Sequence, residues 1–314
     1  MNRKFDFDDI NLIPKYSTVD SRQECDTSIR VGKFVFKNPI IPANMEAVIN
    51  EELAKKLALN GYFYIMHRFG VDPKQFIINM KKENLITSIS IGVNQDSYDI
   101  VSNLIDEDLA PDYITIDIAH GHCKKMKKML KFLKENLKDT FIIAGNVASV
   151  DATADLDNWG ADAIKVGVSP GSACTTAPTT GFGSKNMQAA VINECSQVTK
   201  KLIIADGGIR YPADITKSIV LGASMVMVGG MLSSFLDSPG RIVEIDDVKY
   251  REFYGSASSR QGNKINRIEG TVKLNKLKNI TMLEYMDYLT ECLQSSISYG
   301  GGKKLLDLHS VRWI

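Results

Sequence analysis

Cys174 lies in the middle of a loop of small residues, where a thiol can react rather than pack. The loop reads GVSPGSACTT over residues 167–176 and directly follows a short apolar run. Glycines let the backbone approach a ligand closely and adopt positive φ. A lone cysteine is usually a small buried hydrophobe, but a polar loop has no packing use for one. We therefore predict that Cys174 is the nucleophile of a covalent reaction.

Two glycine-rich turns further along the chain are suited to a phosphate group. Gly207 and Gly208 follow one apolar run, and Gly229 and Gly230 follow the next. Glycine amides donate hydrogen bonds to phosphate oxygens, above all beside a helix N-terminus. Asp206 would repel an anion, so its carboxylate is better matched to the hydroxyls of a ribose. The turns predict a nucleotide with a 5′-phosphate; the alternative is that they are tight turns only.

His120 and His122 are the residues that most resemble a pair of metal ligands. No third ligand lies near them in the sequence, so a metal site there is the weaker interpretation. The five cysteines, at positions 25, 123, 174, 195 and 292, are odd in number and form no C-x-x-C pair. This spacing argues against a disulfide framework and favours a reducing compartment.

Eight short apolar runs must position these residues, at a spacing of roughly 25 residues. The runs are residues 39–41, 62–66, 88–93, 113–118, 141–144, 163–168, 202–205 and 225–228. Amphipathic stretches such as residues 50–60 and 124–137 lie between them. Alternating strands and helices predict a parallel sheet, and eight units predict a (β/α)8 TIM barrel. An open doubly wound sheet would more often carry G-x-G-x-x-G after its first strand, and none follows Ile41.

The ends of the predicted strands gather the polar residues at one rim of such a barrel, where active sites are built. Two long segments interrupt the pattern, at residues 169–185 and 237–271. Long irregular segments in compact domains are often lids or binding loops. We expect the second to be a mobile active-site flap, and we expect residues 1–314 to form a single domain.

Composition excludes several classes of protein. The chain has 314 residues, of which 44% are hydrophobic and 24% are charged, and its formal net charge is +1. This balance is typical of a soluble globular protein without a nucleic-acid partner. The N-terminus has no apolar signal core, and no run reaches the roughly 18 apolar residues of a membrane helix. We therefore expect a cytoplasmic protein with no membrane partner.

These motifs together resemble the IMP dehydrogenase and GMP reductase superfamily. The resemblance begins at FDD, residues 7–9, and ends at SSISYGG, residues 295–301. Between them lie the cysteine loop, the DGGIR turn at residues 206–210 and the Gly229-Gly230 pair. The resemblance covers nearly the whole chain, and it implies a barrel that acts on a purine nucleotide.

Details of the sequence resemble the bacterial reductase branch. No regulatory CBS insertion separates residues 65–68 from residues 88–93, and residues 180–183 resemble the reductase loop. The flap lacks the Arg-Tyr pair with which dehydrogenases activate water. The implied reaction is NADPH-dependent reductive deamination of GMP to IMP and ammonia through a thioimidate on Cys174. An NAD-dependent IMP dehydrogenase without CBS modules and a non-catalytic nucleotide-binding barrel are the alternatives.

The resemblance also assigns roles to residues at matching positions. Thr176 and Glu269 match the pair that handles protons beside Cys174. Residues that match substrate contacts are Ser172, Asp206, Gly207, Gly208, Gly229, Gly230, Tyr254, Gly255 and Ser256. Residues that match cofactor contacts are Arg68, Asp117, Ile118 and Ala119, with a nucleotide segment that begins at Ile203 and ends at Val226. A homotetramer with GMP and IMP as ligands is also implied.

Three residues depart from the pattern of the family. Ser169 replaces a frequent glycine, and Ala177 replaces a frequent basic residue. Both lie at the monovalent-cation site of the family, which implies potassium on the backbone of Ser169, Gly171 and Cys174. The two departures leave this potassium dependence open. Ser256 replaces a frequent methionine, so contacts to the base are expected to differ.

Overall fold

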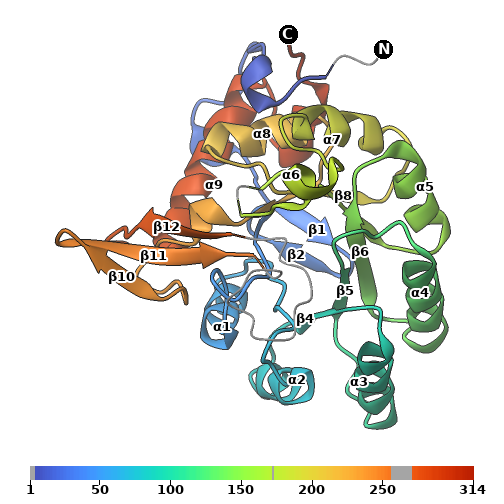
Figure 1. Ribbon diagram of the computed structural model, residues 1–314. Helices are drawn as coiled ribbons and strands as arrows, with labels where there is room; N and C mark the ends of the chain where they lie inside the picture. Colours follow the sequence, from blue (N-terminus) through green and yellow to red (C-terminus); the bar gives the residue numbers. More distant parts are fainter. Residues whose placement is uncertain (1–3, 172, 256–270) are drawn as a thin grey trace.

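The computed structural model describes residues 4–171, 173–255 and 271–314. Within these ranges, seven strands form one parallel sheet in the order β3-β9-β8-β7-β6-β5-β4 (Figure 1). The strands are β3 (Ile40–Pro42), β4 (Ser88–Ile91), β5 (Tyr113–Asp117), β6 (Phe141–Val147), β7 (Ala163–Val166), β8 (Leu202–Asp206) and β9 (Met225–Val228). The sheet curls as in a TIM barrel, which confirms the predicted fold class.

Residues 62–66 occupy the place of the remaining predicted strand, but they form no regular ladder. Their one bridge joins Met66 to Ile89, and the amide of Met66 donates to the carbonyl of Ser88 at 3.1 Å. The amide of Ser88 donates to the hydroxyl of Tyr64 at 3.3 Å, so a side chain takes the place of a main-chain acceptor. On the other side, the amide of Lys37, just before β3, donates to the carbonyl of Gly61. The prediction of a strand was therefore wrong in detail, although the run lies beside β4.

The helices are α1 (Glu51–Leu59), α2 (Pro73–Lys82), α3 (Gln95–Asp106), α4 (Lys124–Asn136), α5 (Val150–Asn158), α6 (Thr176–Thr180), α7 (Gln188–Ser196), α8 (Pro212–Val220) and α9 (Met282–Tyr299). Most of them pack on the outer face of the sheet (Figure 1), whereas α6 belongs to the cysteine loop and brings Thr176 to the cavity. Side chains cap several of them: Asn50 accepts from the amide of Leu53 at the start of α1, and Thr281 and Glu284 form a capping box on α9. These caps satisfy amides that have no partner within the helix.

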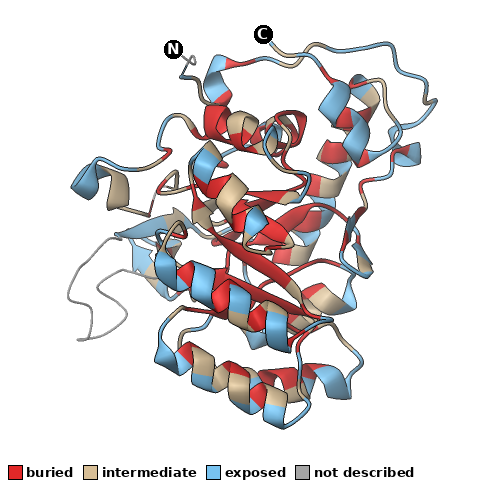
Figure 2. Ribbon diagram, turned by 90° about the vertical axis from the view of Figure 1, so that its right-hand side faces the viewer, coloured by how far each residue is buried: buried red, intermediate tan, exposed pale blue. Residues whose placement is uncertain are grey.

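Helix α4 illustrates how the apolar spacing selects the buried face. Met126, Met129, Leu130 and Leu133 are fully buried, while most of the lysines between them are exposed. The alternation of buried and exposed residues along the outer helices is visible in Figure 2. The lysine cluster is therefore a solvated helix face, as the spacing predicts.

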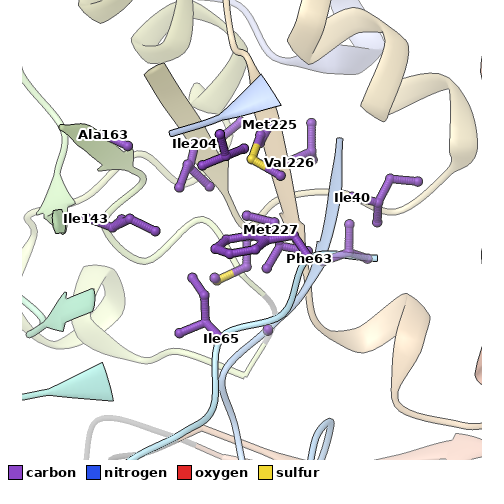
Figure 3. Packing of buried hydrophobic residues seen from close by; sticks show 14 of the residues in the cluster. Ile40, Phe63, Ile65, Ile143, Ala163, Ile204, Met225, Val226 and Met227 are labelled. Atoms are coloured by element: carbon purple, nitrogen blue, oxygen red, sulfur yellow. The ribbon is translucent and has the colours of Figure 1, made fainter. Parts of the chain in front are cut away.

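The core fills the space within and around the curled sheet. Side chains from β3, residues 62–66, β6, β7, β8 and β9 pack into one cluster (Figure 3). Ile40, Phe63, Ile143, Ile204 and Val226 are all 0% exposed. Burial of these apolar side chains stabilises the barrel. The loops at the carboxyl-terminal ends of the strands are then available to form a site.

A separate antiparallel sheet projects from one side of the barrel (Figure 1). It consists of β10 (Ile242–Ile245), β11 (Val248–Tyr254) and β12 (Val272–Lys276). Asp246 and Asp247 both have positive φ, which is the geometry of a two-residue hairpin turn. Residues 237–271 were predicted to be irregular, and this prediction was wrong for β10 and β11. Residues 256–270 of the expected flap lie outside the described residues.

The hairpin of β1 (Ile29–Val31) and β2 (Phe34–Phe36) lies at the amino-terminal end of the barrel, where the hydroxyl of Tyr113 donates to the carbonyl of Val31. The remaining elements of the described ranges are 3-10 helices at residues 7–9, 22–24, 230–232 and 305–310. The amide of Asn11 donates to the carbonyl of Ile314, so the two ends of the chain lie side by side. None of the helices in the described ranges is long and apolar enough to span a membrane.

Candidate active site

The carboxyl-terminal ends of the barrel strands surround a cavity of about 1070 Å³. A cavity of this size is at the upper end of those that hold small ligands and cofactors. Its wall contains residues from the ends of β5, β6, β7, β8 and β9, the cysteine loop and β11. The polar residues that the sequence distributes over these loops are therefore brought to one place, at the rim that barrel enzymes use.

Cys174 lies on this wall, half-buried, beside Thr176. Its Sγ and the hydroxyl Oγ1 of Thr176 are 3.3 Å apart, within hydrogen-bonding distance for sulfur. The amide of Thr271 donates to the carbonyl of Ala173 at 2.9 Å, and Gly255 also lies next to that carbonyl. The ends of β11 and β12 therefore meet the loop at the residue directly before the cysteine.

The turn before Cys174 is closed by two of the three residues that depart from the family pattern. Ser169 has a φ of 56°, and its hydroxyl accepts a hydrogen bond from the amide of Ala177 at 3.0 Å. Gly167, with a φ of 149°, leaves no room for a side chain, because a Cβ atom there would lie 2.0 Å from the carbonyl oxygen of Asp206. The loop is thereby fixed against the end of β8.

Lys165 lies at the centre of a buried ionic network on the cavity wall. Its side chain is only 2% exposed, and its Nζ lies 2.7 Å from Oδ1 of Asp117 and 3.0 Å from Oδ2 of Asp206. The side-chain amide of Asn44 donates to Oδ2 of Asp117 at 3.1 Å. That of Asn146 donates to Oδ2 of Asp206 at 2.7 Å. Each carboxylate is thus held by the shared lysine and by one asparagine of its own.

The network fixes the charges of its members. Burial opposes the charged form of Lys165, but attraction by Asp117 and Asp206 outweighs it and raises the pKa of the ammonium. Burial would raise the pKa of Asp117, but Lys165 and the amide of Asn44 lower it below its ordinary value. The lysine therefore remains an ammonium and Asp117 a carboxylate across the physiological range.

Gly145 provides the space for this lysine. A Cβ atom at position 145 would lie 2.5 Å from Cβ of Lys165 and 2.9 Å from its carbonyl oxygen. Gly145 pairs with Lys165 across β6 and β7. The two strands therefore lie this close to each other only because β6 has a glycine at this register position.

Comparison with known proteins assigns the chain to a family. A family model described as the IMP dehydrogenase / GMP reductase domain matches residues 4–312. The chain belongs to this family. It is 49% identical to the GMP reductase of Mycoplasma mycoides subsp. mycoides SC over 99% of this chain and 97% of that protein. It is 47% identical to the GMP reductases of Albidiferax ferrireducens and Lactobacillus delbrueckii subsp. bulgaricus, over 99% of this chain and 95% and 94% of theirs.

The cavity contains most of the described residues that resemblance to this family singles out. On its wall lie Arg68, Asp117, Ile118, Ala119, Ser169, Gly171, Cys174, Thr176, Asp206, Gly207, Gly208, Gly229, Gly230 and Gly255. Tyr254 is not on the wall, although its neighbours Phe253 and Gly255 are. Ser172, Ser256 and Glu269 lie outside the described residues.

The segment from Ile203 to Val226 reaches the cavity only in part. The wall includes residues 206–210, at the end of β8 and in the turn after it. Ile203 and Ile204 are buried in the core, and α8 follows on the outer face. Most of this segment therefore supports the site from behind.

Among the described residues, the histidines at positions 120 and 122 are not grouped with further metal-ligating side chains. His122 Nε2 lies 2.8 Å from Oδ2 of Asp155, and its ring stacks on Trp159. In the ranges that the structure describes, no three side chains of His, Cys, Asp or Glu are grouped to hold a metal ion.

Sequence reasoning missed Lys165 as a site residue, and it gave no role to Asn44 and Asn146, which follow predicted strands at the rim. Lys165 was counted within the apolar run 163–168, although a lysine in the middle of a buried central strand needs charged partners. That requirement could have indicated in advance that carboxylates lie near Lys165. Lys185 and Lys273 also lie on the wall, and their positions in sequence gave no indication of this.

Proposed function

We propose that this chain catalyses the NADPH-dependent reductive deamination of GMP to IMP and ammonia. The observation that carries the proposal is the half-buried thiol of Cys174, 3.3 Å from the hydroxyl of Thr176, in a cavity that also holds two fixed carboxylates. The relatives named GMP reductase, which align over 99% of this chain, support the same reaction.

The purine nucleotide would lie between the glycine turns and the cysteine. Gly208, Gly229 and Gly230 on the cavity wall would receive the 5′-phosphate. Among the described residues, Oδ1 of Asp206 has no hydrogen-bond partner, because Lys165 and Asn146 both contact Oδ2. Oδ1 would therefore accept hydrogen bonds from ribose hydroxyls. Ser172, Tyr254, Gly255 and Ser256 would complete the substrate contacts.

The wall also offers groups that fit a reduced dinucleotide. Asp117 presents a carboxylate on the cavity wall, flanked by Ile118 and Ala119, and Arg68 lies close enough to lower the pKa of that carboxyl further. Arg68 packs over the ring of Phe69, with its guanidinium carbon 4.6 Å from the ring centroid. Asp117 would receive the cofactor ribose, and Arg68, Lys185 and Lys273 would face its phosphates. When bound, NADPH would supply a hydride to C2 of the purine.

The side chains of the chain would perform the rest of the chemistry. The Cys174 thiolate would attack C2 of GMP, and the C2 amino group would take up a proton and leave as ammonia. Thr176, with Glu269, would relay that proton. The C2–S bond of the resulting thioimidate would break after hydride addition, which releases IMP and restores the thiolate. One GMP, one NADPH and one proton would give one IMP, one ammonia and one NADP⁺.

Several further properties follow from the family and belong to the same proposal. We propose a single catalytic domain over residues 1–314, with a mobile flap at about residues 237–271. A homotetramer in the cytoplasm is proposed, as is a potassium ion on the carbonyls of Ser169, Gly171 and Cys174. Gel filtration with light scattering tests the oligomeric state, for which a tetramer is expected.

Two assay mixtures test the reaction. The purified protein is incubated with GMP and NADPH, and separately with IMP and NAD⁺, while the nicotinamide absorbance and ammonia are measured. We expect GMP-dependent loss of NADPH with one ammonia released for each NADPH oxidised. Turnover in the second mixture alone would instead support an IMP dehydrogenase. Nucleotide binding without turnover in either mixture would support a non-catalytic barrel.

A further inference from the structure

A single lysine joins the two halves of the cavity. Lys165 lies on β7, between Asp117 at the end of β5 and Asp206 at the end of β8. Under the function proposed above, Asp117 faces the cofactor ribose and Asp206 faces the substrate ribose. The same ammonium contacts both carboxylates, at 2.7 and 3.0 Å. Any displacement of this ammonium therefore acts on both binding subsites at once.

Lys165 is unsuited to contact a ligand directly. Its side chain is 2% exposed, whereas the side chains of Asp117 and Asp206 are 22% and 18% exposed. Its ammonium nitrogen already has both carboxylates as partners, at 2.7 and 3.0 Å. The role of Lys165 in the site is therefore to hold other groups in place.

We propose that Lys165 is a positioning residue that sets the orientation of both ribose-binding carboxylates, Asp117 and Asp206, and so couples the substrate and cofactor subsites. This inference rests on the proposed function for the identity of the two ligands. Without the ammonium, two partly buried carboxylates would face each other without a shared counter-ion, and like charges at close range disfavour joint ionisation. Each carboxylate would then either turn away from the other or take up a proton. In neither case would it keep the position and charge with which it accepts hydrogen bonds from ribose hydroxyls.

The two asparagines divide the effect between the subsites. Asn44 contacts Asp117, and Asn146 contacts Asp206. We therefore expect Asn44→Ala to weaken the binding of NADPH more than that of GMP. Asn146→Ala should weaken the binding of GMP more than that of NADPH. Only variants of Lys165 should weaken the binding of GMP and of NADPH to a similar degree.

The experiment compares Lys165→Met with the matched control Lys134→Met. Lys134 also pairs with an aspartate, Asp162, at 3.0 Å, but neither residue lies on the cavity wall. Dissociation constants for GMP and NADPH are measured from pH 5.5 to 9, by calorimetry and by nucleotide fluorescence. For Lys165→Met we expect both constants to rise at least about tenfold, while Lys134→Met keeps the wild-type values.

The pH profile separates positioning from a general loss of structure. The charged groups that face the pair are Arg68 and Lys165 for Asp117, and Lys165 for Asp206. Lys165→Met removes the shared cation, so a new ionisation should appear in both binding profiles, with weaker binding on its acid side. Lys165→Arg keeps the charge but not the point-like ammonium. It should raise both constants severalfold without the new ionisation.

The possible results distinguish a failure of the role proposed for Lys165 from a failure of the proposed function. Unchanged constants for Lys165→Met, or a rise in only one of them, overturn the positioning role. If Lys165→Met does not fold, Lys165→Arg decides, and wild-type constants for both ligands would overturn the role. A wild-type protein that binds both nucleotides but does not oxidise NADPH contradicts the proposed reaction alone. A wild-type protein that binds neither nucleotide contradicts both.

Discussion

Gly145→Ala tests whether the barrel depends on the space that β6 leaves for Lys165. Carbon atoms in contact lie about 3.5–4.0 Å apart, whereas the added methyl carbon would lie 2.5 Å from Cβ of Lys165. The atoms must separate by about 1 Å. Rotation of the Lys165 side chain cannot relieve this contact, because its Cβ and its carbonyl oxygen, 2.9 Å from the new methyl group, are both fixed by the backbone of β7.

The strands β6 and β7 must therefore move apart, and overpacking of this kind costs about 1–3 kcal/mol. Denaturant unfolding of Gly145→Ala should show a lower midpoint with an unchanged m-value. Gly171→Ala is the control, because a Cβ atom there would meet no atom within 4 Å. Its free energy of unfolding should match the wild type or slightly exceed it. A Gly145→Ala protein as stable as this control would refute the argument that the glycine is required where β6 lies against Lys165.

Three other changes give expected results. Burial lowers the pKa of His67 from 6.5 to about 4, so its neutral ring stabilises the fold above pH 6.5, and about 3 kcal/mol of this contribution is lost as the pH falls to 4. Between pH 6.5 and 4, the free energy of unfolding of His67→Gln should fall by less than that of the wild type. An equal fall in the two proteins would contradict the lowered pKa of His67. Arg68→Ala should raise the KM for NADPH about tenfold or more and that for GMP little; the reverse pattern would place Arg68 at the substrate. Replacement of potassium by choline should lower kcat, and an unchanged kcat would remove the proposed cation site.

The barrel strands could be predicted because their apolar runs are short, regularly spaced and bounded by turn residues. Residues 225–228 form β9 as predicted, and the run at 113–118 differs from β5 by one residue. Residues 62–66 were less predictable. Their composition is that of a strand, but the hydroxyl of Tyr64 intercepts the amide of Ser88, and no sequence pattern reveals such a competition.

The projecting hairpin was missed because its turn lacks the usual residues. Asp246 and Asp247 both adopt positive φ, a geometry that Asn-Gly or Asp-Gly would have indicated. The flanking strands also alternate weakly, since β10 is largely exposed. Irregular polarity over residues 237–271 was therefore read as an irregular loop.

Site residues could be predicted where their type is unusual for the sequence around them. Cys174 in its small-residue loop and the glycine pairs after β8 and β9 could be identified in this way, and the structure places them on one wall. Lys165, Asn44 and Asn146 act through partners distant in sequence. Lys165 and Asp117 are 48 residues apart, so only the folded sheet, in which β6 alone separates β5 from β7, brings them together.

The most direct test of the account is the turnover and nucleotide affinity of Cys174→Ser. The hydroxyl cannot form the thioimidate, while the glycine turns and Asp206 that would bind GMP are unchanged. Ammonia release and NADPH oxidation should fall to the background rate, and the dissociation constant for GMP should stay within a few fold of the wild type. Turnover near the wild-type rate would show that Cys174 is not the nucleophile and would contradict the central claim.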